Sequence, residues 1–283
     1  MNENLVDSGS LLLPASATSL SHQVDILFYF IVILSLIFFI PIVIVLVMFS
    51  IRYVRSKLNP AAASQMTHNT VLELSWTIIP LILVMVIFYW GAQGFMAMSV
   101  APKNALEIRL TAQKWYWQFE YKNGVRTRNE IVVPKGQPIK LLMTSNDVIH
   151  SFFVPNFRTK RDVVPNRYTT LWFTADKTGH FQVFCAEFCG DGHSQMLGTV
   201  RVLTPTAYEQ WLQKEAQASN ENVPLDELGK KVFETACLAC HSTDGSPKAG
   251  PTWKGLYLSK QAGEGGKAAI ADANFLRESI IDP

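Results

Sequence analysis

The chain has 283 residues, of which 48% are hydrophobic and 17% charged, and its formal net charge is +2. Its mean hydropathy of +0.14 is high for a soluble protein, which indicates a membrane portion joined to small folded domains. The near balance of charge, without a Lys/Arg run interleaved with aromatic residues, argues against nucleic acid as a partner. Four cysteines form two close pairs, so no thiol remains for a structural disulfide if both pairs bind cofactors.

Residues 1–24 form a polar segment that carries Glu3 and Asp7 but no Lys or Arg. A signal peptide would need a basic start and a longer apolar run than this segment has. The triplet Ala15-Ser16-Ala17 does resemble a cleavage site, so processing stays open as an alternative. We expect residues 1–24 to be an extracytoplasmic N-terminal segment.

Two apolar runs follow, from Ile26 to Ile51 and from Leu74 to about Met98. At 1.5 Å per residue the first is about 39 Å long, more than the roughly 30 Å hydrocarbon core of a bilayer. Neither run shows the polar stripe of a surface helix. The sequence therefore predicts a transmembrane helical hairpin over residues 25–99.

The loop between the two runs carries Arg52, Arg55 and Lys57. The bias of basic residues towards cytoplasmic loops predicts that this loop is cytoplasmic and that both termini lie outside.

Glu73 directly precedes the second apolar run, and two roles are open for it. Thr70-Val71-Leu72-Glu73 has the spacing of a capping box, whose carboxylate would return to the Thr70 amide. An ionisable group at a membrane boundary can also serve proton uptake. Spacing alone does not choose between the two roles.

After Ala101-Pro102 the pattern changes to short strand-like segments separated by turns, which predicts a β-sandwich or barrel over residues 100–205. Lys122-Asn123-Gly124 supplies a hairpin turn. The predicted strands are Leu106–Ala112, Trp115–Tyr121, Glu130–Val133, Ile139–Thr144, Thr169–Thr174, Gly179–Phe184 and Gly198–Leu203.

One predicted strand places Trp115, Trp117, Phe119 and Tyr121 on a single face, because side chains alternate along a strand. Most of these rings should belong to a packed core. An indole left exposed beside a redox metal would instead receive electrons, and periodicity cannot separate these two roles.

The segment from Cys185 to Met196 gathers two thiols, an imidazole (His193) and a thioether on one Gly-containing loop, and His150 stands upstream. A Cys185–Cys189 disulfide would leave His193 and Met196 unexplained. The spacing of the thiols also fits a structural zinc. Thioethers are poor zinc ligands, whereas two His, thiolate and a weak axial Met are the ligands of cupredoxin copper.

Thr206-Ala207-Tyr208-Glu209 is another predicted capping box, and it opens a helix-and-linker segment over 206–224. Residues 225–283 then contain Cys237-Leu238-Ala239-Cys240-His241, the signature of c-type haem attachment. The two thiols can form thioether bonds, and His241 becomes the proximal iron ligand. Residues 225–283 are marginal in number for a self-sufficient apolar core, so a covalently held haem would supply much of their packing.

These motifs together resemble subunit II of the haem–copper cytochrome c oxidases, in the form with a fused cytochrome c domain. The resemblance implies a multidomain fold of a two-helix transmembrane hairpin, an all-β cupredoxin-like Greek-key barrel and a small all-α cytochrome c domain. It also implies that two thiolates bridge a dinuclear copper A centre with weak axial ligands. The implied ligands are His150, Cys185, the Glu187 carbonyl, Cys189, His193 and Met196.

Further roles follow from the same resemblance. The Glu187 side chain and Asp162 would belong to a magnesium site shared with subunit I, although Asp162 fits an ordinary loop salt bridge equally well. Trp115 matches the tryptophan through which electrons reach copper A. Glu73 matches the carboxylate at the mouth of a proton pathway into subunit I.

The resemblance implies an electron-transfer subunit of a proton-translocating terminal oxidase in a bacterial inner membrane. Electrons would pass from cytochrome c or another donor through haem c and copper A to subunit I, with subunit III and membrane lipid as further partners. Six His and two membrane helices cannot build the oxygen-reducing site, so that site belongs to another subunit. A copper A nitric oxide reductase subunit and a zinc-stabilised membrane-anchored scaffold remain as alternatives.

One departure concerns the haem. No Met follows Met196, so the axial Met expected after Cys237-Leu238-Ala239-Cys240-His241 is missing, and no spare His follows His241. We expect the cytochrome c domain to be incomplete at Pro283 and the natural chain to continue.

Overall fold

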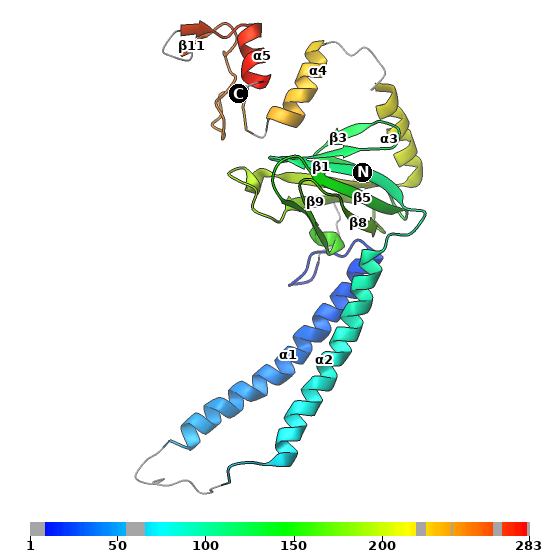
Figure 1. The fold of residues 1–283 in the computed structure, drawn as a ribbon, viewed down its shortest axis with the longest axis vertical. Coiled ribbons are helices and arrows are strands. Elements are labelled where there is room, and N and C mark those ends of the chain that lie inside the picture. The colour runs from blue at the N-terminus through cyan, green and yellow to red at the C-terminus, as the bar shows by residue number, and fades with distance from the viewer. Residues whose placement is uncertain (1–8, 55–65, 219–224, 239, 263–267, 282–283) are drawn as a thin grey trace.

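The computed structural model describes residues 9–54, 66–218, 225–238, 240–262 and 268–281. Figure 1 shows a long helical hairpin, a β domain at one end of it, and a small C-terminal part beyond the β domain. Glu3, Asp7, Arg55, Lys57 and the linker 219–224 lie outside the described residues.

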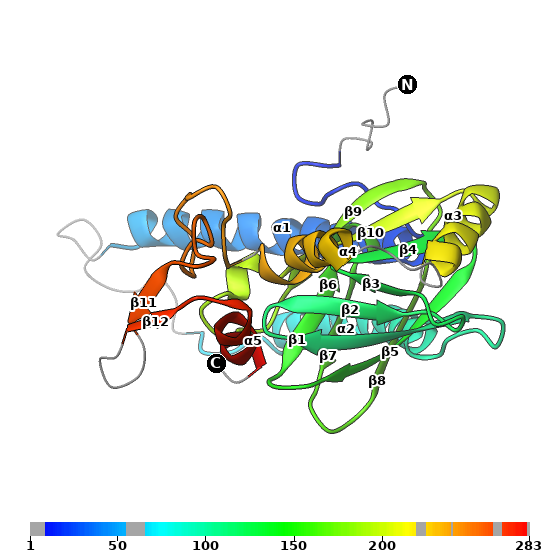
Figure 2. The same cartoon turned by 90° about the horizontal axis from the view of Figure 1, so that it is seen from above.

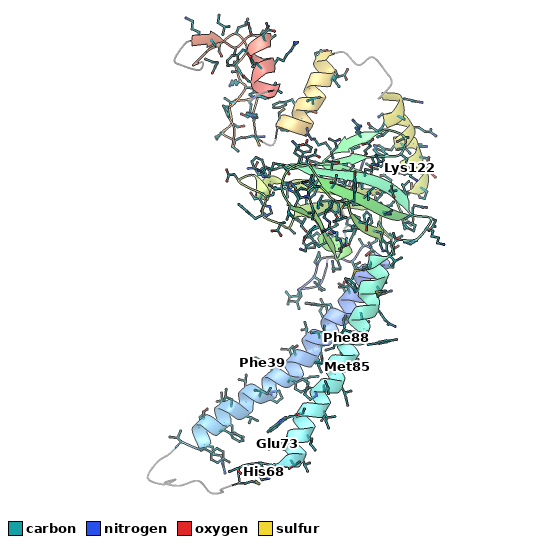
Figure 3. The ribbon with its side chains drawn as sticks, viewed as in Figure 1. Phe39, His68, Glu73, Met85, Phe88 and Lys122 are labelled. Atoms are coloured by element: carbon teal, nitrogen blue, oxygen red, sulfur yellow. The ribbon has the colours of Figure 1, made fainter. Side chains whose placement is uncertain are left out.

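Both predicted apolar helices are present, as α1 (Ser19–Arg52) and α2 (Thr70–Ser99). They are 34 and 30 residues long, and no residue of their most apolar windows is buried by the rest of the protein. The side chains of Phe39, Met85 and Phe88 accordingly project outward (Figure 3). Helices of this length and composition can cross a membrane.

The N-terminal cap of α2 differs in detail from the prediction. The side chain of Asn69 accepts the Leu72 N–H at 3.1 Å, and the Glu73 carboxylate accepts the Asn69 N–H at 3.2 Å. The capping box predicted at Thr70 is therefore wrong by one residue, because Asn69 is itself a favourable N-cap. Glu73 and His68 lie at the end of α2 that is remote from the β domain (Figure 3).

The β domain consists of two five-stranded sheets, with strand orders β3-β2-β1-β5-β8 and β4-β10-β9-β6-β7. The strands of the first sheet are β1 (Leu106–Gln113), β2 (Tyr116–Glu120), β3 (Arg126–Arg128), β5 (Pro138–Ser145) and β8 (Thr169–Thr174). Those of the second are β4 (Glu130–Pro134), β6 (His150–Val154), β7 (Thr159–Val163), β9 (Gly179–Cys185) and β10 (Leu197–Leu203).

The core between the two sheets follows from alternation along the strands. In β5 every second residue is buried, and Trp117, Phe119 and Tyr121 are buried in and just after β2. All seven predicted strands are present. β3, β6 and β7 were missed because β3 is short and β7 carries charged side chains, while the buried pattern of β6 does not alternate.

Specific contacts join the β domain to the hairpin. Arg158 Nε donates to Asp25 of α1 at 2.7 Å, and Trp172 Nε1 donates to the Ala97 carbonyl of α2 at 3.2 Å. The N–H of Ala17 donates to the Asn156 carbonyl at 3.0 Å. These contacts hold the β domain at the end of the hairpin opposite Glu73 (Figure 3).

The remaining elements follow the β domain. α3 (Pro205–Ala218) packs on it through Trp211, which contacts Tyr121, and Thr204 caps this helix by accepting the Ala207 N–H. The capping box predicted at Thr206 is therefore wrong. The C-terminal part contains α4 (Leu225–Val232), a π-helical turn (Phe233–Cys237), β11 (Lys260–Ala262), β12 (Ala268–Ile270) and α5 (Ala273–Ile281).

The small ladder of β11 and β12 qualifies the expectation of an all-α tail. Figure 2 shows α3 and this ladder at opposite sides of the sandwich.

Candidate metal centre

Three buried side chains from distant parts of the sequence meet at one end of the second sheet. β6 begins at His150 and pairs with β9, whose last residue is Cys185. The ligand atoms of His150, Cys185 and Cys189 all lie within 4.8 Å of one another. Strand pairing thus brings together residues that lie 35 positions apart in the sequence.

The other predicted ligands surround this group. Cys185 Sγ lies 3.9 Å from Cys189 Sγ and 3.2 Å from the Glu187 carbonyl oxygen. Cys189 Sγ lies 3.5 Å from His193 Nδ1 and 3.9 Å from Met196 Sδ. His150 Nδ1 lies 3.9 Å from Cys185 Sγ. The structure therefore brings together all six residues that the sequence singled out.

The two thiols differ in acidity. Burial opposes ionisation of Cys185, but hydrogen bonds with His150 and with the Ser151 backbone outweigh it and lower its pKa to about 7. Burial and the neighbouring Cys185 charge raise the pKa of Cys189. Both thiols can therefore be thiolates together only when cations offset their repulsion.

The donor set fits copper. Both thiols are free and are not joined as a disulfide. Two thiolates, two imidazoles and a buried thioether are soft or borderline ligands, and the thioether suits copper better than zinc.

Asp147 is a polar partner of this centre that the sequence analysis missed. Its Oδ1 lies 2.8 Å from His150 Nε2, so the carboxylate keeps that nitrogen protonated and turns Nδ1 towards Cys185. The available signal was an acid three residues before His150 in Asp147-Val148-Ile149-His150. Hydrogen bonds from His150 and two backbone amides outweigh burial and lower the pKa of Asp147.

Trp115 lies apart from Trp117, Phe119 and Tyr121, with which the alternation grouped it on one strand face. It precedes β2, is half-buried, and its Nε1 donates to the Cys189 carbonyl at 3.3 Å. Its ring lies against Gly192, where an added Cβ would come within 2.3 Å of the indole. The indole therefore lies on the metal-binding loop, whereas Trp117, Phe119 and Tyr121 fill the core.

Asp162 and the Glu187 loop lie on either side of Ser151. Asp162 Oδ1 accepts the Ser151 hydroxyl at 2.8 Å, and the Ala186 N–H donates to the Ser151 carbonyl at 2.9 Å. Asp162 also lies 3.8 Å from Lys160 Nζ, and both side chains are more than half exposed. The Asp162 carboxylate thus takes part in a surface ion pair as well.

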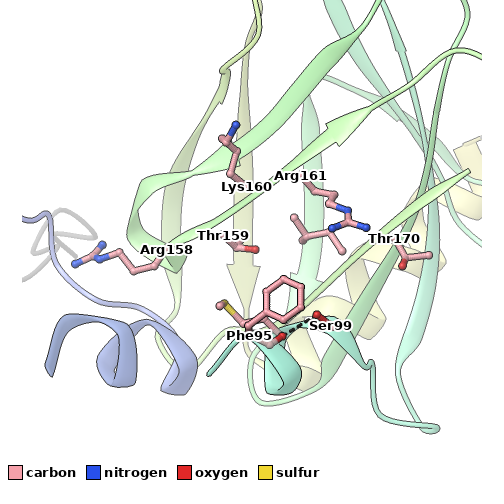
Figure 4. Close-up of a pocket in the computed structure, with 9 residues that line it drawn as sticks. Phe95, Ser99, Arg158, Thr159, Lys160, Arg161 and Thr170 are labelled. Atoms are coloured by element: carbon pink, nitrogen blue, oxygen red, sulfur yellow. Dashed lines mark hydrogen bonds between the residues drawn. The ribbon is translucent and has the colours of Figure 1, made fainter. Parts of the chain in front are cut away.

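A pocket of about 300 Å³ separates the end of α2 from β7. Phe95, Ser99, Arg158, Lys160 and Arg161 line it, together with Thr170 (Figure 4). Its cations point in different directions, and Arg158 is already paired with Asp25. The pocket therefore has no convergent set of charges.

The second predicted site lies in the C-terminal part. The N–H of His241 donates to the Cys237 carbonyl at 2.8 Å, which folds the motif into one turn. His241 Nδ1 lies 2.8 Å from the Pro251 carbonyl, so Nδ1 donates and Nε2 is free to bind a metal. A cavity of about 720 Å³ lined by His241, Trp253, Tyr257, Phe275 and Ile280 adjoins the motif.

Comparisons with known families match this architecture in chain order. Residues 7–91 match the transmembrane domain of cytochrome c oxidase subunit II, and residues 123–203 match its periplasmic domain. Residues 227–274 match cytochrome c.

Relatives of known identity agree with the family matches. Cytochrome c oxidase subunit 2 of Alkalihalophilus pseudofirmus is 30% identical over 250 residues, which cover 82% of this chain and 73% of that protein. The subunit 2 of Cereibacter sphaeroides is 28% identical over 208 residues, covering 60% and 68%. A solved periplasmic domain of subunit II from Bradyrhizobium japonicum is 32% identical with a TM-score of 0.41, covering 42% of this chain and 99% of that one. The chain therefore belongs to the cytochrome c oxidase subunit II family and carries a C-terminal cytochrome c domain.

Proposed function

We propose that this chain relays electrons from a cytochrome c-type donor, through haem c and copper A, to the haem–copper centre of subunit I. The observation that carries this proposal is the convergence of His150, Cys185, Cys189, His193 and Met196 within the β domain. The domain assignments we propose are 1–24, 25–99, 100–205, 206–224 and 225–283, as the sequence predicted.

The proposed copper ligands are His150, Cys185, the Glu187 carbonyl, Cys189, His193 and Met196. A copper pair held by these residues would supply a site that gains and loses one electron. Two of these ligands, His150 and Met196, are fully buried, and the hydrogen bond with Asp147 restricts the orientation of the His150 ring. Such a site favours electron transfer over bond-making chemistry.

The proposed haem ligands are Cys237 and Cys240 for covalent attachment and His241 for the iron. Because His241 Nδ1 donates to the Pro251 carbonyl, Nε2 would be available to bind the haem iron, and the adjacent cavity has the size of a cofactor pocket. We propose Trp115 as the side chain through which electrons reach copper A. Its bond to the Cys189 carbonyl supports this role.

Oxygen reduction and proton translocation belong to the assembled complex. We propose subunits I and III as partners, Glu73 as the mouth of a proton pathway, and Glu187 with Asp162 as magnesium ligands at the subunit I interface. The chain would sit in a bacterial inner membrane with its N- and C-terminal parts on the extracytoplasmic side. The remoteness of Glu73 from the β domain supports this arrangement.

The nitric oxide reductase and zinc-scaffold alternatives are not favoured, because the relatives described above are oxidase subunits. Assaying the purified complex for consumption of oxygen and of nitric oxide separates the first alternative. Zinc content without visible absorption would identify the second.

The proposal is tested by Cys185→Ser in the assembled complex. We expect the copper A absorption to disappear and the c-type haem spectrum to remain, because Cys185 lies in the centre of the ligand group. Ala186→Ser adds a hydroxyl group to the same loop at an exposed position and should keep both spectra. Wild-type copper absorption and cytochrome c oxidation in Cys185→Ser would refute the assignment.

A further inference from the structure

The carboxylate of Asp147 accepts from four groups around it. Oδ1 lies 2.8 Å from His150 Nε2, 2.6 Å from the Val148 amide nitrogen and 3.2 Å from Ser145 Oγ. Oδ2 accepts the Lys114 N–H at 2.7 Å. Asp147 thus joins the turn that ends β5 and the start of β6 to the turn between β1 and β2.

The Lys114 amide matters because it directly precedes Trp115. From Trp115 the contacts return to the metal loop, since the indole donates to the Cys189 carbonyl and lies against Gly192. One carboxylate therefore touches both the imidazole of His150 and the backbone that carries the indole.

An amide of the same shape cannot replace this carboxylate. A carboxylate offers acceptor positions on both oxygens, whereas a carboxamide has one acceptor oxygen and one donor NH2 group. If the NH2 group faced Lys114, two donors would oppose each other. If it faced His150, Nε2 would have to accept, and the ring proton would move to Nδ1, which is the nitrogen that faces Cys185.

We propose that Asp147 is a positioning residue that fixes both the ring of the ligand His150 and the indole of Trp115. A substitution of Asp147 should therefore alter the positions of both side chains together. This inference rests on the proposed function, because it takes His150 as a copper ligand and Trp115 as the side chain that receives electrons. Asp147 itself touches neither the metal nor the donor in this account.

The test compares Asp147→Asn with Asp191→Asn in the full-length chain of the assembled complex. Asp191 is an exposed carboxylate on the metal loop and provides the matched control for the loss of one charge. Hydrogen exchange of the segment 113–117, followed by mass spectrometry, reports the Lys114 amide. The copper absorption spectrum and the rate of copper loss to a chelator report the His150 side.

For Asp147→Asn we expect about tenfold faster exchange of the Lys114 amide, as loss of a charge-assisted hydrogen bond predicts. We also expect a changed copper spectrum and about tenfold faster copper loss. Asp191→Asn should match the wild type in both measurements. A change confined to one measurement, or equal changes in the two variants, would overturn the proposal.

Different results would refute the proposed function and the positioning role of Asp147. Hydrogen exchange is also measured after copper has been removed, where the bond from Lys114 to Asp147 needs no metal. If the wild type shows no copper A absorption, the proposed function fails, although Asp147→Asn still speeds exchange. If copper A is normal in Asp147→Asn, the positioning role fails and the copper assignment stands.

Discussion

The proposed copper and haem sites bring their ligands together in different ways. The copper ligands that we propose come from residues as far apart as His150 and Met196, and strand pairing places His150, Cys185 and Cys189 in one buried group. The haem ligands that we propose are neighbours in the sequence, from Cys237 to His241, beside an open cavity. One site is built by long-range topology and the other by a local turn.

This contrast predicts a difference in how each region depends on its cofactor. The core of the β domain is complete without a metal, because Trp117, Phe119 and Phe152 are fully buried. The C-terminal part has little buried apolar surface among its described residues, where Ala271 is the buried apolar side chain. We therefore expect the β domain to fold without copper, and the C-terminal part to need haem for its packing.

The largest effect is expected from removal of the haem attachment. In Cys237→Ser combined with Cys240→Ser, covalent haem should be lost. The C-terminal part should then become sensitive to protease, because haem would no longer occupy the cavity beside His241. Haem staining after denaturing electrophoresis and limited proteolysis measure this. Copper A absorption should persist.

The corresponding control removes copper and keeps the haem. A copper-free sample should resist protease in the β domain as well as the copper-loaded protein does. Equal protection of the C-terminal part with and without haem would remove the contrast between the two regions.

An intermediate effect is expected from Trp117→Ala. The ring is fully buried, and its centroid lies 5.4 Å from that of Phe152 and 6.1 Å from that of His150. The substitution should destabilise the β domain by about 3–5 kcal/mol through the cavity it leaves. Loss of copper absorption on heating should move to a lower temperature, while haem attachment is kept.

Trp117→Phe is the matched control. Trp117 Nε1 has no hydrogen-bond partner among the described residues, so the smaller ring removes an unsatisfied donor and fills most of the space. A shift as large as that of Trp117→Ala would mean that the indole contributes more than its packing.

The smallest effect is expected at the rim of the β domain. Lys140 donates to Glu107 at 2.9 Å and lowers the pKa of that carboxyl. A carboxyl whose pKa is lower in the folded than in the unfolded protein stabilises the fold at pH values above its unfolded pKa. That stabilisation is lost as the pH falls through the folded pKa. Because both side chains are 34% exposed, Glu107→Gln should cost at most about 0.5 kcal/mol at neutral pH.

A double-mutant cycle with Lys140→Gln isolates this interaction. The coupling measured by thermal loss of copper absorption should be present at neutral pH and absent in acid. A coupling that increases in acid would contradict the direction of the pKa shift.

The sequence was most informative where a signal is local. The helical hairpin, the Cys185–Met196 loop and the haem motif are contiguous patterns, and the alternation of apolar residues located seven strands. The role of Asp147 and the contacts of Trp115 could not be predicted from residue patterns, because both depend on contacts across the fold: Lys114 meets Asp147, and Trp115 meets Gly192. Alternation placed Trp115 on the same strand face as Trp117 and could not separate a core role from an exposed one, and the chain turns just before β2.

The caps show the same limit on a smaller scale. Thr70 and Thr206 both had capping-box spacing, yet Asn69 and Thr204 are the residues that cap the helices. Where two candidate caps stand close together in the sequence, the side chain that reaches the free N–H decides the start of the helix.

The most direct measurement is electron paramagnetic resonance of the purified complex, combined with copper analysis and a c-type haem assay. We expect two coppers and one covalent haem in this chain, and a hyperfine pattern in which one electron is shared by both copper nuclei. Cys185→Ser should remove that pattern and leave the haem. A signal from a single isolated copper, or a full zinc complement without copper, would contradict the account.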